Sequence, residues 1–136
     1  MLLIRTTLLL VSMLGVIVSV EQTNGYYTLQ ANDSLGDWTI RNGQVWVVYG
    51  ASWCAPCKIL DRNLRTLMPQ WDLTVIYVDA DVHRHLLVKR NIGTLPTIAM
   101  YLDGQQLTTA QQVDADYLKH CYGIIQEHAR QRGSQP

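Results

Sequence analysis

Five segments of the chain carry the hydrophobic pattern of β-strands. The continuous apolar runs of residues 45–49, 73–78 and 97–102 contain several β-branched side chains, which predicts strands covered on both faces. Shorter strands are predicted at residues 26–30 and 105–110. An Asp-Gly turn signal separates the last two segments, so these two strands are expected to form a hairpin.

Two long helices are predicted from apolar residues that recur every three or four positions. The first begins near residue 54 and continues to Met68, and Pro69 ends its pattern. The second is predicted at residues 114–132, with acidic residues in its first turn and arginines in its last. The apolar stripe of this last helix consists of Leu118, Cys121, Tyr122 and Ile125.

Two shorter helices complete the pattern. One of residues 32–34 can cap a helical segment that continues to about Ile40, and Asp81 is expected to cap a helix through about Asn91. The inward side of this second helix is predicted to hold Val82, Leu86 and Leu87. The order strand, helix, strand, helix, strand, helix, strand, strand, helix indicates an α/β fold whose sheet combines parallel strands with a closing antiparallel hairpin.

Residues 1–20 differ from the rest of the chain, because Arg5 is followed by fifteen uncharged residues. This is the pattern of a signal peptide, and with Leu2–Ile4 included the segment is long enough for a membrane anchor. A buried N-terminal helix is the third interpretation. We expect a signal peptide or anchor at residues 1–20, a linker at 21–25 and a domain at 26–132, exported to the periplasm or the outer face of a bacterial inner membrane.

The charge of the chain argues against a nucleic-acid partner. The 136 residues have a formal net charge of zero, and only 16% of them are charged. Nucleic-acid binding requires a basic stripe that neutralises phosphates, and the sequence has none.

Two of the three cysteines, Cys54 and Cys57, follow a predicted buried strand and begin the next helix. Residues at i and i+3 lie on one helical face, so the two sulfurs can meet in a disulfide. Unpaired backbone N–H groups and the positive end of the helix dipole face Cys54, and both favour the nucleophilic thiolate. Pro56 fits the first turn, where its missing N–H costs nothing. This pattern favours redox chemistry.

Two other uses of the cysteine pair stay open. A structural disulfide that closes so short a loop would add little stability, and a zinc site would need ligands beyond this single C-x-x-C. His83 and His85 point to different sides of a helix and are interpreted as solvated surface residues. Cys121 lies in an apolar stripe and is interpreted as a core thiol.

Two motifs carry a resemblance to a known family. Residues 53–58, WCAPCK, resemble the WC-x-P-CK signature of the thioredoxin family, and residues 94–97, TLPT, resemble its cis-proline loop. The order and spacing of elements are similar over about residues 26–130. The resemblance implies a thioredoxin fold, which is a three-layer α/β/α arrangement around a central mixed five-stranded sheet.

The resemblance also implies a role for each cysteine. Cys54 would be the exposed nucleophile that forms a mixed disulfide with a substrate. Cys57, more buried, would resolve that intermediate and leave the Cys54–Cys57 disulfide.

Five further residues would support the pair. Trp53 would shield it, and Ala55 and Pro56 would form the stiff dipeptide between the sulfurs. Pro96 would be cis and face the sulfurs, while the backbone of Leu95 would pair with an extended substrate segment.

The chain also departs from the family pattern. Thioredoxins of the reducing type usually carry a buried aspartate six residues before the first cysteine, where this chain has Val48, and Tyr77 replaces the usual lysine partner. Arg62 stands near the place of a mid-helix proline, and Gln112 near that of a glycine. The resolving step is therefore expected to use water or substrate groups as proton acceptor.

The expected function is that of a thiol–disulfide oxidoreductase that acts on protein thiols and disulfides and is restored by a second redox protein. No metal or organic cofactor is expected. Two other hypotheses are a non-catalytic peptide-binding module with the same fold, and a metallochaperone that uses the two thiols with His83 or His85.

Overall fold

The computed structural model of the protein describes residues 25–135. The order of helices and strands in this part of the chain is the predicted one. The elements are β1 (Gly25–Thr28), α1 (Leu35–Thr39), β2 (Gln44–Gly50), α2 (Ala55–Leu67), the 3₁₀ turn η1 (Met68–Gln70), β3 (Leu73–Asp79), α3 (Arg84–Lys89), β4 (Thr97–Leu102), β5 (Gln105–Ala110) and α4 (Ala115–Gly133).

The five strands form one mixed sheet in the order β1-β3-β2-β4-β5. Strands β1, β3 and β2 are parallel, β4 is antiparallel to β2, and β5 is antiparallel to β4. The parallel part follows from the helical crossovers, and the antiparallel part from the hairpin between β4 and β5. All seven residues of β2 are buried, as its central place requires.

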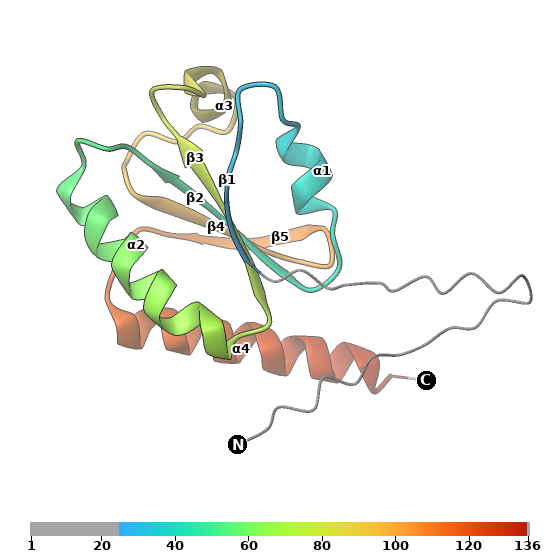
Figure 1. The fold of residues 1–136 in the computed structure, drawn as a ribbon. Coiled ribbons are helices and arrows are strands. Elements are labelled where there is room, and N and C mark those ends of the chain that lie inside the picture. The colour runs from blue at the N-terminus through green and yellow to red at the C-terminus, as the bar shows by residue number, and fades with distance from the viewer. Residues whose placement is uncertain (1–24, 136) are drawn as a thin grey trace, which may run out of the picture.

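Alternate residues of β2 point to opposite faces of the sheet, and each face is covered by two helices (Figure 1). Trp46 and Val48 pack in one cluster with residues of α2 and α4. Val45, Val47 and Tyr49 pack in the other, with residues of α1 and α3. The predicted three-layer α/β/α fold is therefore confirmed.

Helices α2 and α4 bury the stripes that the sequence predicted for them. Leu60 and Leu64 of α2 and Leu118 of α4 are fully buried in the shared cluster. Cys121 is half-buried and packs against this cluster, so the prediction of a core thiol holds only in part.

Helix α3 is shorter than predicted. It begins at Arg84 instead of following a cap at Asp81, because the chain makes a turn at residues 80–82 and the backbone of His83 is not helical (φ −115°, ψ 40°). Val82 lies in this turn and is 55% exposed, so its predicted inward position is wrong. Leu86 and Leu87 do pack inward.

Among the helices of residues 25–135, none is both long and apolar enough to cross a membrane. The signal peptide or anchor predicted at residues 1–20 lies outside the described residues, as does most of the predicted linker at 21–25.

Candidate active site

The site begins where β2 ends and the chain turns into α2. Cys54 is the N-cap of α2, with an extended backbone (φ −88°, ψ 109°), and its N–H donates to the Ala51 carbonyl (3.2 Å). The Cys57 N–H donates to Cys54 Sγ (3.3 Å), so the sulfur takes up one of the N–H groups that the first turn leaves unpaired. Ala55 and Pro56 complete this turn and are exposed.

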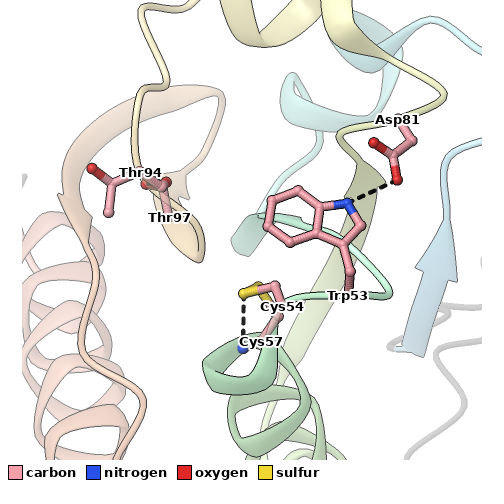
Figure 2. The surroundings of a disulfide bond; sticks show 6 residues. All are labelled: Trp53, Cys54, Cys57, Asp81, Thr94 and Thr97. Atoms are coloured by element: carbon pink, nitrogen blue, oxygen red, sulfur yellow. Dashed lines mark hydrogen bonds between the residues drawn. A yellow bond between two sulfur atoms is a disulfide. The ribbon is translucent and has the colours of Figure 1, made fainter.

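Cys54 and Cys57 are joined in a disulfide at the start of α2, with their Cα atoms 5.3 Å apart (Figure 2). They are equally buried, with exposed fractions of 6% and 5%. The prediction that Cys54 is the exposed member is therefore wrong for the disulfide form. The physical reason is that both cysteines pack with Ala51 and Ala80 in one small cluster, which half-buried Leu87 and Leu95 also contact.

Trp53, next to the pair, is 69% exposed. Its indole Nε1–H donates to Asp81 Oδ2 (3.1 Å), and Figure 2 shows the ring turned toward that carboxylate. Asp81, predicted as a helix cap, instead fixes the orientation of Trp53. Its own N–H donates to Asp79 Oδ1 (2.8 Å), which keeps the carboxylate beside the site.

The loop before β4 contacts the site from the other side. The peptide bond between Leu95 and Pro96 is cis, as expected, and Pro96 is buried. The Thr97 hydroxyl donates to the Thr94 carbonyl (2.6 Å), which closes the loop around the proline. Half-buried Leu95 packs against the cysteine cluster, so the loop lies within reach of anything bound to the sulfurs.

Val48 and Tyr77 are neighbours in the sheet. This was expected, because they stand at the positions of an aspartate and the lysine that is its usual partner. They pair directly between β2 and β3, and Val48 is 2% exposed among apolar side chains. The Tyr77 ring lies over Gly50, where an added Cβ would come within 2.9 Å of its Cε2. A larger residue at position 50 would therefore require the Tyr77 ring to move.

A cavity of about 270 Å³ opens beside Cys57 between α2, β1 and β3. It is lined by Tyr26, Thr28, Ala51, Ser52, Cys57, Lys58, Asp61, Arg65 and Tyr77. The sequence motifs pointed to Cys57, Lys58 and Tyr77 but to none of the other residues that line this cavity. The available signal was the i, i+4 spacing of Cys57 and Asp61, which places both on one face of α2.

The charged and phenolic groups of this cavity interact with one another. Arg65 Nε donates to both oxygens of Asp61 (3.1 Å each), and its guanidinium lies 4.0 Å from the ring centre of Tyr26. Burial, followed by the hydrogen bond to Asp61, raises the pKa of Tyr26 above its usual value. Burial also raises the pKa of Tyr77, helped by the charges of Asp79, Asp61 and Asp81. Both phenols therefore stay protonated at neutral pH.

His83 and His85, at the start of α3, divide between core and surface. His83 is 1% exposed and its Nε2 lies 2.9 Å from the Leu29 carbonyl, so its predicted solvated position is wrong. The reason is that α3 starts at Arg84, which leaves His83 in the turn that faces the loop after β1. His85 is exposed, as predicted. Within residues 25–135 no three His, Cys, Asp or Glu side chains are grouped for a metal ion.

Comparisons with known proteins agree with the fold and the motifs. A sequence model of the thioredoxin family matches residues 30–121. The mitochondrial thioredoxin-2 of Schizosaccharomyces pombe is 32% identical over 103 residues, which cover 73% of this chain and 77% of that protein. The structure of a point mutant of thioredoxin from Halobacterium salinarum NRC-1 superposes with a TM-score of 0.63 at 29% identity, over 74% of this chain and 88% of that one.

Other matches cover less of the relative. Thioredoxin 3 of Plasmodium falciparum is 29% identical over 63 residues, or 46% of this chain. The chain spans 35% to 62% of the length of this relative and two further curated ones.

Proposed function

The chain belongs to the thioredoxin family, and on that basis we propose that it is a thiol–disulfide oxidoreductase that exchanges disulfides with protein substrates through Cys54 and Cys57. The observation that carries the proposal is the position of Cys54 Sγ, which accepts a backbone N–H at the start of α2. An N–H donor and the helix dipole stabilise a thiolate, and the thiolate is the species that attacks disulfides.

The reaction proceeds in two exchanges. The Cys54 thiolate attacks one sulfur of a substrate disulfide, forms a mixed disulfide and releases the other substrate sulfur as a thiolate. Cys57 then loses its proton and attacks Cys54 Sγ, and the second substrate sulfur leaves. The substrate gains two electrons and two protons, and the protein keeps the Cys54–Cys57 disulfide. Reversal of the same steps oxidises a substrate dithiol.

Substrates of this reaction are proteins or peptides that can lie in an extended conformation against the cis-proline loop. Leu95 contacts the cysteine cluster, so a strand paired with its backbone would place a sulfur next to Cys54. Trp53, exposed and fixed by Asp81, offers an aromatic surface on the opposite side (Figure 2). A second redox protein uses the same surface to restore the dithiol.

We also propose that the domain works outside the cytoplasm, at the periplasmic side of a bacterial inner membrane. The support is the sequence of residues 1–20, with Arg5 before an uncharged apolar segment. A fusion of residues 1–25 to a reporter enzyme that is active only after export tests this directly. Activity of the fusion supports export, and loss of that activity in the fusion with residues 1–20 deleted assigns it to this segment. An inactive fusion contradicts it.

The redox proposal is tested with a trapping variant. Cys57→Ser removes the resolving sulfur, so mixed disulfides on Cys54 should accumulate and be released by dithiothreitol. The double variant Cys54→Ser, Cys57→Ser is the matched control and should trap nothing. If the single variant captures no substrate, or if the double variant keeps the biological function of the protein, the domain acts as a binding module and the redox proposal fails.

A further inference from the structure

The resolving step needs a proton acceptor near Cys57. The thiol of Cys57 must lose its proton before the sulfur attacks the mixed disulfide, because the thiolate is the nucleophile. Val48, close to the site in the sheet, is apolar and packed among apolar side chains, so it can accept no proton. The acceptor has to lie elsewhere.

The cavity beside Cys57 supplies a place for it. Cys57 and Asp61 are one helical turn apart on α2, and both line this cavity. Side chains at i and i+4 have Cβ atoms about 5–6 Å apart, which is the reach of one bridging water between a sulfur and a carboxylate. A volume of about 270 Å³ is ample for several waters.

Elimination among the lining groups leaves one base. The phenols of Tyr26 and Tyr77 stay protonated because burial and neighbouring carboxylates hold their pKa values above the usual range. Lys58 and Arg65 are cations and can only donate. The hydroxyls of Thr28 and Ser52 are too weakly basic, so Asp61 is the one carboxylate among the described residues that line the cavity.

We propose that Asp61 takes up the proton of Cys57, through water in this cavity, when Cys57 attacks the mixed disulfide. This inference rests on the proposed redox function. In the step, the S–H bond of Cys57 breaks, the new Cys54–Cys57 bond forms, and the substrate sulfur leaves as a thiolate. Asp61 holds the proton until bulk water removes it, and the substrate thiolate is protonated from solvent.

The neighbours of Asp61 orient its carboxylate. Arg65 donates to both oxygens of the Asp61 carboxylate. The Tyr26 hydroxyl lies within hydrogen-bond reach of the same carboxylate, and this contact raises the pKa of Tyr26. The ion pair is open to solvent, with exposed fractions of 58% for Arg65 and 39% for Asp61, so solvent screens its charge and the carboxylate can exchange protons with water. The ionisable groups that line the cavity together with Asp61 and Cys57 are Lys58 and Arg65 on α2, Tyr26 on β1 and Tyr77 on β3.

The two exchanges can be timed separately with a chromogenic aromatic disulfide in a Cys121→Ser background. The reduced protein should release one coloured thiolate when Cys54 attacks and a second when Cys57 resolves. Cys57→Ser should show only the first phase. Absence of a fast first phase contradicts the proposed redox function. A substitution that changes only the rate of the second phase tests the role of Asp61 and leaves the proposed redox function in place.

Asp61→Asn should leave the first phase unchanged and slow the second at least about tenfold near pH 6, because general bases typically contribute more than that. The slowing should shrink as pH rises, since hydroxide then deprotonates Cys57 instead. Asp61→Glu keeps a carboxylate and should restore the wild-type pH profile.

Asp116→Asn is the matched control, because it removes a carboxylate from an exposed helical ion pair, with Lys119, away from the cavity. It should change neither phase. A second phase of Asp61→Asn that equals wild type at all pH values overturns the proposal. Equal slowing at every pH, or failure of Asp61→Glu to restore the rate, also overturns it, because the role would then be structural.

Discussion

In the proposed function, the thiol of Cys54 would gain acidity from atoms that belong to the backbone. Lowering a thiol pKa from about 8.5 to about 7 requires about 2 kcal/mol, and a helix dipole supplies about 0.3–1 kcal/mol of it. The N–H of Cys57, which points at Cys54 Sγ, is the natural source of the remainder. Exposure does not distinguish the two cysteines, so the proposed role of Cys54 as the attacking sulfur depends on its place at the N-cap.

His83 and His85 provide a matched pair for a prediction about single residues. His83→Leu should lower the free energy of unfolding by about 1–3 kcal/mol, because the buried Leu29 carbonyl loses its partner. His85→Leu, at an exposed position, should change it by less than about 0.5 kcal/mol. Urea denaturation measures both. Equal effects of the two substitutions would contradict the buried placement of His83.

At the scale of elements, helix ends hold the site together. The N-terminus of α2 holds the cysteines, and the turn before α3 holds Asp81 against Trp53. Sequence periodicity placed α2 and α4 well because their apolar stripes are long. It misplaced the start of α3, a six-residue helix that begins only after the non-helical backbone of His83 (φ −115°, ψ 40°). A single non-helical residue of this kind leaves no mark on the apolar pattern.

The cap of α4 allows a test of this element alone. Asp114 Oδ1 accepts the Tyr117 N–H (2.9 Å), so Asp114→Ala should cost about 1 kcal/mol of unfolding free energy. Asp116→Ala, in the same first turn but without a capping bond, should cost less, because it loses only the dipole interaction and a surface ion pair. Thermal or urea unfolding of both variants provides the comparison. A larger loss for Asp116→Ala would refute the assignment of the cap.

At the scale of the whole molecule, the sheet brings together residues that the sequence keeps apart. The parallel pairing of β1, β3 and β2 places Tyr26 and Tyr77 beside α2 and creates the cavity at Cys57. The fold, the two cysteines and the cis proline could be predicted because each depends on local pattern or motif. The cavity could not, because its walls come from three elements whose side-chain packing no short segment encodes.

The buried tyrosines predict how the molecule responds to alkali. Burial raises the pKa of Tyr49, at the centre of the sheet, to about 12 from 10.0. Folding favours the protonated phenol of Tyr49. Tyr49 therefore makes its full contribution to the free energy of unfolding below pH 10, and this contribution is lost as the pH rises toward 12. Tyr49→Phe should reduce the fall in unfolding free energy over this range by on the order of 2 kcal/mol. Identical pH profiles for the variant and the wild type would contradict the assignment.

The central claim is that Cys54 is an activated nucleophile, and alkylation of the reduced protein tests it most directly. Mass spectrometry after brief treatment with iodoacetamide, over a series of pH values, gives the rate at each cysteine. We predict that below pH 7 Cys54 reacts about tenfold faster than Cys57 and Cys121, and faster than cysteine in an unfolded peptide. If Cys54 reacts no faster than the peptide thiol, the account of this site is contradicted.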